Sequence, residues 1–560
     1  MRDSARGRRG QHRCHGGGAE RGLSAMATLR VRAGGALHLL AYDPDAGNSL
    51  RAILEPTDFR VRTACLGLGA CGLCRVRVLA GEVGAPTAVE RVQLEDALLA
   101  ERVRLACQCR PVGEVEIEVL SLAPPSSWHV PPGGLASIGT LRWEADPAPS
   151  HAVPRPLGVA VDLGTSHISV ALIDLIGARP LALRVGANPQ RAHGADVMTR
   201  LVAAGDPDHA RALASLARAA VGEALGEIAR SEGIDLRRVR RVLVVGNTAM
   251  LSLLADRNHQ RLLEPANWSL PIDCAPLETA SWGREWGLAP EASIEVVAPL
   301  AGFVGSDLLA GVVAERMPEL RTPGLLIDFG TNSEIALWSG DTLWVTATAG
   351  GPAFEASAGR DCIPAEAGAV VRVREGEGGA LECDIIAGDE PRGLCGSGLV
   401  DLLACLLRQR RLGPRGRFSD DSERVEFEVN GRMLGLGWRE VDALQRAKAA
   451  IGAGMKVLCG CAGVDPYALQ RVLVAGLFGS HLDLDSAAAI GLLPRLPEGR
   501  VVLVGNTALA GACGLLLCAD ARRMLERVRA CARFVNLGRM AAFDEAFLDQ
   551  LFLQPMGSPP

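Results

Sequence analysis

Three cysteines lie within ten residues of the chain, in a segment that reads Cys-Leu-Gly-Leu-Gly-Ala-Cys-Gly-Leu-Cys. Their spacing is C-x5-C-x2-C, and the residues between them are glycine or small and apolar, without charge. Glycine adopts positive φ readily, so its backbone N–H groups can approach a ligand, as they do around iron–sulfur sites. A [2Fe–2S] cluster needs four thiolates. The segment therefore predicts such a cluster, with three of its ligands being Cys65, Cys71 and Cys74.

A fourth thiolate is available in the segment Arg-Leu-Ala-Cys-Gln-Cys-Arg, where Cys107 and Cys109 are both candidates. Zinc and disulfides are the other uses of closely spaced cysteines. Structural zinc sites usually contain two C-x2-C knuckles. The cysteine segment contains only one, which argues against zinc. No stretch reads as a cleavable secretory signal, so we expect a reducing compartment, where disulfides are rare.

The segments on either side of the cysteines predict the order of a small α+β domain. Alternating apolar residues indicate strands, and one short stretch favours a helix between the second strand and the cysteine loop. The strands are expected at residues 28–32, 36–41, 75–79 and 114–120, and the helix at 48–54. This order resembles a β-grasp ferredoxin, and the loop is similar to that of adrenodoxin-type ferredoxins. Leu-Ala-Cys-Gln resembles the fourth-ligand segment of that family, which favours Cys107 over Cys109.

Length and composition set broad limits on the rest of the chain. With 560 residues, the chain exceeds one core and should hold three or four domains. It is 48% hydrophobic and 22% charged, with a formal net charge of −5, which predicts a cytoplasmic globular protein without a general attraction to nucleic acid. No uninterrupted run of 18 apolar residues appears, so we expect no membrane span. The abundance of Ala, Leu, Val and Gly favours α/β architecture with buried parallel strands.

Two segments differ from the rest in composition. Residues 1–25 are rich in arginine and glycine, which can indicate a transit peptide, but an upstream start codon with Met26 as the true start is the interpretation we favour. A ferredoxin domain is then expected over residues 26–122. Prolines recur over residues 123–155, which predicts a linker. Trp128 and Trp143 in this linker suggest that parts of it dock on a surface.

An Asp-x-Gly-Thr turn between two apolar strands occurs twice, in residues 157–175 and 325–337. The first copy contains Asp162, Gly164, Thr165 and Ser166. The second contains Asp328, Gly330, Thr331 and Asn332, followed by Glu334. An aspartate can bind Mg²⁺ directly or through water, glycine lets the backbone approach a phosphate, and hydroxyls donate hydrogen bonds to it. One such turn alone is a common hairpin, whereas two copies indicate a duplicated fold.

The pair of turns resembles the phosphate motifs of the actin, sugar-kinase and Hsp70 superfamily. Residues 471–480, a buried strand followed by a glycine turn, resemble its adenosine motif, with Gly476 and Gly479 against the nucleotide. The resemblance implies ATP and Mg²⁺ as ligands, catalytic roles for Asp162 and Asp328, and a role for Glu334 in holding the metal or orienting a water. A P-loop signature is not present.

Two further segments, residues 242–250 and 501–509, each read as a buried strand that ends in Gly-Asn-Thr. We interpret this echo as a sign of duplication that places Asn247 and Asn506 at matching strand ends. Asparagine at such a position serves as a helix N-cap or as a ligand, and the sequence leaves both roles open.

A ferredoxin, a proline-rich linker and this ATPase fold occur in the same order in reductive activators of corrinoid proteins, which the chain resembles from Met26 onward. The resemblance also rests on longer sequence motifs at residues 188–190, 194–197, 303–307, 351–355 and 394–398. Asp307, Glu355 and Asp401 lie in or beside these motifs and rank below Asp162 and Asp328 as metal or water ligands. The implied fold class is α/β multidomain: a β-grasp ferredoxin, then a duplicated actin/Hsp70-like ATPase with domains at 156–310 and 311–555.

The resemblance implies an ATP-dependent protein of one-carbon metabolism that passes one electron from its [2Fe–2S] cluster to a corrinoid protein. That electron returns inactive Co(II) to Co(I) for methyl transfer. The implied partners are the corrinoid protein of a methyltransferase system, an upstream electron-donor reductase and a second copy of the chain, paired through the ATPase domain. The alternatives are a small-molecule kinase with a redox-sensing ferredoxin domain, and a ferredoxin on a degenerate ATPase scaffold.

Overall fold

The computed structural model describes residues 27–557, apart from residues 34–35, 55–56, 58, 60, 63–68, 70, 123–127, 132–133, 140, 145, 147–154, 195, 351–358, 366–367, 387–389, 421 and 477–480. Three of the predicted site residues lie outside this range: Cys65, Glu355 and Gly479. The chain divides into two compact units, Met1–Val61 with Arg75–Leu122, and Arg62–Cys74 with Ala123–Pro560. In the part that the structure describes, no helix is long and apolar enough to cross a membrane.

The first unit is built on one five-stranded sheet with the strand order β2-β1-β5-β3-β4. The strands are β1 (Ala27–Ala33), β2 (Ala36–Tyr42), β3 (Arg75–Glu82), β4 (Val103–Leu105) and β5 (Val112–Val119). The helices are α1 (Leu50–Leu54), α2 (Ala88–Gln93) and α3 (Asp96–Ala100). Strands β1 and β5 pair in parallel and the other pairs are antiparallel, so the predicted order of strands and helix is confirmed.

The first half of the second unit contains a sheet with the order β10-β9-β6-β7-β8. Its strands are β6 (Leu157–Leu163), β7 (His167–Asp174), β8 (Arg179–Ala187), β9 (Val239–Gly246) and β10 (Ser293–Val296). Its helices are α4 (Val197–Ala203), α5 (Pro207–Glu232), α6 (Thr248–Ala255), α7 (Ala280–Glu285) and α8 (Ser306–Ala314). The longest of them, α5, begins after the N-cap Asp206 and ends at Gly233 in the left-handed conformation.

The second half contains a sheet with the order β20-β19-β11-β12-β13-β21. Its strands are β11 (Gly324–Phe329), β12 (Ser333–Trp338), β13 (Leu343–Thr348), β19 (Arg471–Ala475), β20 (Val501–Gly505) and β21 (Ala532–Phe534). Its helices are α9 (Gly396–Arg408), α10 (Trp438–Ala462), α11 (Leu484–Ala489), α12 (Thr507–Leu517), α13 (Ala519–Cys531) and α14 (Ala541–Gln550). Two small sheets accompany them, formed by β14 (Ala369–Glu375), β15 (Leu381–Ile385) and β16 (Gly393–Leu394), and by β17 (Arg424–Val429) and β18 (Arg432–Gly437).

The two large sheets repeat one pattern, which is the duplication that the sequence predicts. In each, an antiparallel hairpin (β6–β7 or β11–β12) is followed by a third antiparallel strand, and the first hairpin strand pairs in parallel with a later strand, β9 or β19. Beyond these strands, β10 matches β20. The predicted domain boundaries, including the division between residues 310 and 311, stay predictions.

The interpretation of the two Gly-Asn-Thr segments as matching strand ends is wrong. Asn247 follows β9, which pairs directly with β6, whereas Asn506 follows β20, which lies one strand further from β11. Both asparagines are N-caps, because the side chain of Asn247 accepts from the N–H of Met250 and that of Asn506 accepts from the N–H of Leu509. The shared Gly-Asn-Thr motif therefore reflects the local chemistry of a strand-to-helix turn. It does not mark equivalent positions in the two halves of the duplication.

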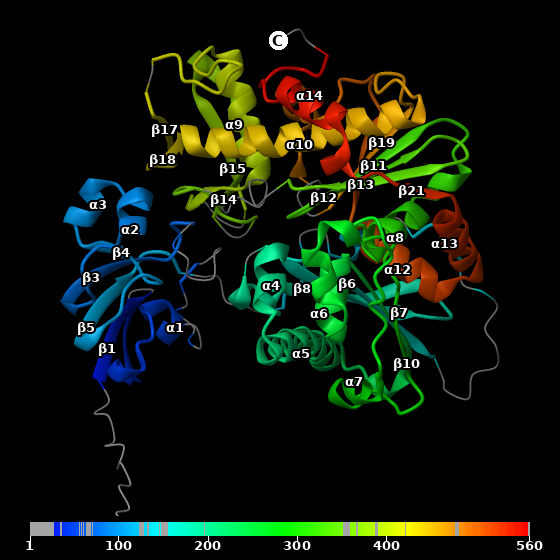
Figure 1. Cartoon of the computed structure of the whole chain (residues 1–560), viewed down its shortest axis with the longest axis horizontal. Helices are drawn as coiled ribbons and strands as arrows, with labels where there is room; N and C mark the ends of the chain where they lie inside the picture. The colour runs from blue at the N-terminus through cyan, green and yellow to red at the C-terminus, as the bar shows by residue number, and fades with distance from the viewer. Residues whose placement is uncertain are drawn as a thin grey trace, which may run out of the picture. The chain divides into compact units, whose positions relative to one another are not determined.

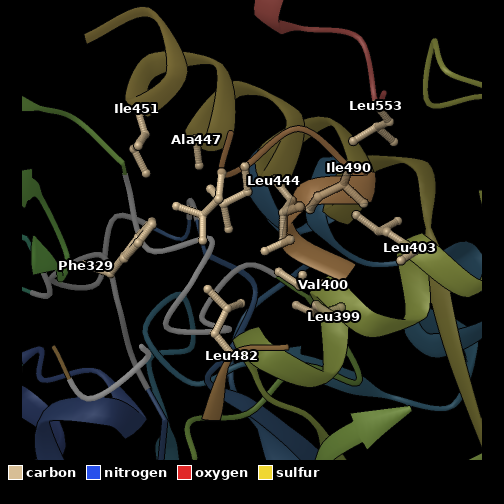
Figure 2. Packing of buried hydrophobic residues seen from close by; sticks show 14 of the residues in the cluster. Phe329, Leu399, Val400, Leu403, Leu444, Ala447, Ile451, Leu482, Ile490 and Leu553 are labelled. Carbon is tan, nitrogen blue, oxygen red and sulfur yellow. The ribbon is translucent and has the colours of Figure 1, made fainter. Parts of the chain in front are cut away.

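The core of the second half extends to the second phosphate hairpin. Figure 2 shows side chains from α9, from α10 and from the segments that follow them, which belong to one buried cluster: Leu399, Val400, Leu403, Leu444, Ala447, Ile451, Leu482, Ile490 and Leu553. Phe329, the residue after Asp328, belongs to the same buried cluster and is 2% exposed. The apolar packing therefore fixes the end of β11, from which Asp328 projects.

Both tryptophans of the predicted linker pack on the second unit, which confirms the expectation that they dock. Trp128 lies against Gly186 of β8, where an added Cβ would be 2.8 Å from the indole ring. Trp143 is buried, and a Cβ on Gly514 of α12 would be 2.4 Å from its ring. His129 also exchanges backbone hydrogen bonds with Val185 at 2.9 and 3.0 Å.

The two halves meet along α8 and α12, which lie side by side in Figure 1. A glycine makes this approach possible, because a Cβ on Gly511 of α12 would be 2.0 Å from the carbonyl oxygen of Ala310 in α8. Only a residue without a side chain fits so close to another backbone.

We expect Gly511→Ala to lower the free energy of unfolding by about 1–3 kcal/mol, because the added methyl overlaps backbone that cannot move away cheaply. Gly460→Ala in α10 is the matched control, since nothing lies within 4 Å of a Cβ at that position. The control should be neutral or slightly stabilising. Thermal unfolding of the purified variants measures both effects. Equal unfolding midpoints for Gly511→Ala and Gly460→Ala would contradict the close packing of α12 on α8.

Candidate functional site

The first phosphate hairpin connects β6 and β7. Asp162 lies near the end of β6, paired in register with Ser169 of β7. The turn is held from β8, because Asn188 donates from its amide Nδ2 to the carbonyl of Gly164 at 2.8 Å and from its backbone N–H to the carbonyl of Ser166 at 2.8 Å. A Cβ on Gly164 would be 2.6 Å from the carbonyl oxygen of His167, so the turn requires glycine there.

The second hairpin connects β11 and β12 and places two acids opposite each other. Asp328 and Glu334 are direct cross-strand partners, so their side chains share one face of the sheet. In the turn, the N–H of Gly330 donates to the carbonyl of Asn332 at 3.0 Å. Gly476, from the adenosine-motif segment, has φ +92°, and a Cβ on it would be 2.3 Å from the carbonyl oxygen of Phe329 and 2.9 Å from Oδ1 of Asp328. The structure thus brings this predicted nucleotide residue against the second hairpin.

The two hairpins, one from each half, contact each other. The hydroxyls of Ser166 and Thr331 are hydrogen-bonded at 3.0 Å. Thr165 accepts a hydrogen bond at 3.0 Å from Nδ2 of Asn247, the residue that caps α6. Ser166 and Thr331, which the sequence assigns to phosphate binding, therefore meet where the two halves join.

A fourth acid, Asp307 in the first turn of α8, joins this group. Loss of hydration raises the pKa of Asp307 to about 8, and the carboxylates of Asp162 and Asp328 add to the rise. Loss of hydration also raises the pKa of Asp162 to about 6 and, with the Asp162 carboxylate, that of Asp328 to about 7. The pKa of Glu334 is raised well above its ordinary value by burial, then by Asp307 and Asp328. The sequence ranks Asp307 below Asp162 and Asp328, and the structure places it within electrostatic reach of both.

Asp162 has a hydrogen-bond donor of its own. Nδ2 of Asn506 donates to Oδ2 of Asp162 at 2.8 Å, and this bond lowers the pKa of the carboxyl group against the effect of burial. Asn506 is therefore a helix cap and a site residue at once. Its place in the site carries no sequence signal, because the two residues are 344 positions apart.

The acids fit a magnesium–nucleotide site better than a preformed metal site. Among the residues that the structure describes, no three His, Cys, Asp or Glu side chains are arranged to hold a metal ion by themselves. Mg²⁺ in phosphate sites typically keeps several waters and binds one or two carboxylates together with the substrate's phosphates. Raised carboxyl pKa values are also what such a cluster shows before a cation neutralises it.

The described part of the cysteine loop has the backbone that the sequence predicts. Gly69 has φ +81° and Gly72 has φ +63°, both in the region that favours glycine. Cys71 is half-buried and Cys74 is buried.

The segment that carries Cys107 is fixed by a buried ion pair in the first unit. Arg104 donates from Nε and Nη2 to the two carboxylate oxygens of Glu90, each at 2.8 Å, and both side chains are buried. Glu90 also accepts from the backbone N–H of Leu105 at 2.9 Å. Cys109 is completely buried, whereas Sγ of Cys107 accepts from Nε2 of Gln108 at 3.5 Å.

Asp401, and two residues of the second half that the motifs do not assign to the site, have neighbours other than the acids at the junction. Asp401 of α9 accepts from the backbone N–H of Val373 at 3.2 Å and lies 3.8 Å from Arg372. Cys395 is a buried residue at the start of α9, with Sγ 3.2 Å from Oγ of Ser397. Burial lowers the pKa of His481. These contacts tie Asp401 and Cys395 to neighbouring groups of the second half.

The matches to family models follow the same division of the chain into a first unit and the two halves of the second unit. The C-terminal domain of RACo, the ASKHA domain, matches residues 322–559, and the RACo middle region matches residues 157–320. The 2Fe–2S iron–sulfur cluster binding domain matches residues 41–112. The chain belongs to the family of reductive activators of corrinoid proteins. The predicted fold class, a ferredoxin followed by an actin/Hsp70-like ATPase fold, is confirmed.

Relatives of known function agree with this family. The corrinoid activation enzyme RamQ of Eubacterium limosum is 27% identical over 425 residues, which are 71% of each chain. The [Co(II) methylated amine-specific corrinoid protein] reductase of Methanosarcina barkeri is 26% identical over 401 residues, 64% of this chain and 70% of that one. The solved structure of a reductive activator for a corrinoid, iron–sulfur protein covers 94% of this chain and 98% of its own, with a TM-score of 0.65 and 24% identity, and so shares the fold.

We expect the unfolding of the chain without nucleotide to depend on Asp307 and on pH. A carboxyl group whose pKa rises from about 3.9 to about 8 on folding binds more protons in the folded state, so its contribution to stability falls as pH rises through that window. Asp307→Asn should therefore raise the unfolding midpoint at pH 8 and change it much less at pH 5. The exposed control Asp341→Asn should shift neither midpoint, and equal shifts of Asp307→Asn at both pH values would contradict the clustering of acids.

Proposed function

We propose that the chain is an ATP-dependent one-electron donor that reduces the inactive Co(II) form of a corrinoid protein to Co(I). The observation that carries the proposal is the convergence of Asp162, Asp307, Asp328 and Glu334 from both halves of an ATPase fold, in a chain that also has a ferredoxin domain. The names of the relatives, a corrinoid activation enzyme and a reductase of a Co(II) corrinoid protein, support the same reaction.

The [2Fe–2S] cluster would supply one electron, held by Cys65, Cys71, Cys74 and a fourth thiolate. We propose Cys107 for the fourth, as the resemblance of Leu-Ala-Cys-Gln to the fourth-ligand segment of ferredoxins implies; Cys107 and Cys109 are both buried, so exposure does not choose between them. The ion pair of Glu90 and Arg104 fixes the strand that leads into this segment. The role of this ion pair is therefore to hold the fourth thiolate in one position.

ATP with Mg²⁺ would supply the free energy for an uphill transfer. Plant-type ferredoxin clusters have potentials near −400 mV, and each further 100 mV costs about 2.3 kcal/mol per electron. Asp162 and Asp328 would face the metal, with Glu334 beside them to hold it or orient a water. The turns at Gly164 and Gly330 would bring N–H groups to the phosphates, together with the side chains of Thr165, Ser166, Thr331 and Asn332. Gly476 and Gly479 would lie against the adenosine.

The partners follow from this reaction. A corrinoid protein of a methyltransferase system would accept the electron, and an upstream reductase would restore the cluster. A cytoplasmic location and pairing of two copies through the ATPase domain complete the proposal. The proposed reaction needs no covalent phosphoenzyme, so ATP would act through binding and hydrolysis.

Substitution of the two candidate fourth ligands tests the cluster. Purified protein should contain about two irons and two acid-labile sulfides per chain. Cys107→Ser should lose them, since it removes a ligand, whereas Cys109→Ser should retain them as its matched control. Iron analysis and the visible spectrum measure both. Loss of iron from Cys109→Ser with retention in Cys107→Ser would reverse the choice of ligand.

Substitution of Asp328 tests the use of ATP. Asp328→Ala removes a carboxylate at the second phosphate hairpin, so it should nearly abolish ATP hydrolysis and Co(I) formation while leaving the cluster spectrum unchanged. Asp341→Ala, at an exposed position between β12 and β13, is the control and should behave as the parent chain. Full-rate Co(I) formation by Asp328→Ala would show that ATP is not coupled to electron transfer. Phosphorylation of a small hydroxyl compound without any corrinoid response would favour the kinase instead.

A further inference from the structure

The side-chain amide of Asn506 has its orientation fixed by two contacts. Oδ1 accepts a hydrogen bond at 2.8 Å from the N–H of Leu509, which makes Asn506 the N-cap of α12. Because the oxygen is engaged there, the NH2 group must point the other way, where it donates to Oδ2 of Asp162 at 2.8 Å. It also lies 3.4 Å from Oγ of Ser169, the register partner of Asp162.

This contact joins the second half of the ATPase unit to the first phosphate hairpin. Asn506 begins α12, and α12 packs on α8 through the close approach of Gly511 to Ala310. Asp307 lies in the first turn of α8. The two helices that cross between the halves therefore each present a polar side chain to Asp162, one a carboxyl group and the other an amide donor.

Besides Asn188, which donates to Gly164, the first hairpin receives an amide donor from a second helix N-cap. Asn247 caps α6 through Oδ1 and donates from Nδ2 to Thr165 at 3.0 Å. Both Gly-Asn-Thr segments thus use one amide for two purposes, and both donate to the first hairpin. An ordinary N-cap needs only the acceptor, which serine or aspartate supplies as well as asparagine. The donor at each position is extra to capping.

We propose that Asn506 is a positioning residue for ATP hydrolysis: its amide holds the Asp162 carboxylate in the orientation that the magnesium–nucleotide site needs and couples that orientation to the crossing of α8 and α12. The inference rests on the proposed ATPase function. A donor opposite Asp162 also offsets the proximity of Asp307 and Asp328, so the carboxylate has one stable direction instead of turning away from its neighbours.

Three substitutions in the full chain separate positioning from capping. Asn506→Ser keeps a capping oxygen but is too short to reach Asp162, Asn506→Asp keeps the size and the cap but replaces the donor with an acceptor, and Asn506→Ala removes both functions. Asp206→Ser, at the exposed N-cap of α5, is the control for exchanging one capping residue for another. For each variant, thermal unfolding, MgADP binding by calorimetry and the kcat and KM for ATP are measured.

We expect Asn506→Ser to unfold at nearly the same temperature as the parent chain, while its kcat and its magnesium-dependent affinity for ADP fall roughly 10- to 100-fold, as for other residues that orient a metal ligand. Asn506→Asp should lose at least as much, and the KM for ATP at saturating magnesium should change little. Asp206→Ser should match the parent chain in every measurement.

Parental kcat and ADP affinity in both Asn506→Ser and Asn506→Asp would overturn the inference and leave Asn506 as a cap alone. If Asn506→Ser does not fold, Asn506→Asp decides, because it preserves both shape and cap. If the parent chain does not hydrolyse ATP, the proposed function fails and ADP affinity decides the inference separately. Weaker magnesium-dependent binding in the variants would then still support a positioning role, and unchanged binding would refute it.

Discussion

Four acidic side chains lie within electrostatic reach of one another where the two halves of the ATPase unit meet, and much of the surrounding structure exists to hold them there. Asp162 and Asp328 come from matching hairpins, Glu334 from the strand opposite Asp328, and Asp307 from the crossing helix α8. Like charges in a poorly hydrated place cost free energy, which the raised pKa values express. Under the proposed function, a bound cation and phosphates would offset this cost.

The packing around these acids explains how the arrangement survives. Phe329, at the end of β11, belongs to the same buried cluster as the apolar side chains of α9 and α10 that Figure 2 labels. The glycine contact between α8 and α12 brings Asp307 and Asn506 to the same carboxylate. The hydroxyl pair of Ser166 and Thr331 joins the hairpins directly. A change in the angle between the halves would alter all of these contacts together, and under the proposed function this would link the nucleotide site to the packing of the two halves.

The sequence predicted those features that depend on local pattern. The hairpins with Asp162 and Asp328, the ferredoxin strand order and the glycine turns were recognisable because each is contained in a short run of residues. Contacts between segments that are far apart in the sequence were not recognisable in this way. Asp307 ranks below Asp162 and Asp328 in the sequence because nothing local places it beside them, and the bond from Asn506 to Asp162 has no local signal either. The two Gly-Asn-Thr motifs led to the wrong prediction of matching strand ends, because the same capping chemistry occurs at positions that the duplication does not relate.

The most direct test of the account follows Co(I) formation from a Co(II) corrinoid protein by the reduced parent chain, under anaerobic conditions, with MgATP, with MgADP or without nucleotide. The visible spectrum of the corrinoid reports the product. The account predicts Co(I) with MgATP, and little or none with MgADP or without nucleotide. Formation at the same rate in all three conditions would contradict it, because the acids at the junction of the halves would then have no part in the electron transfer.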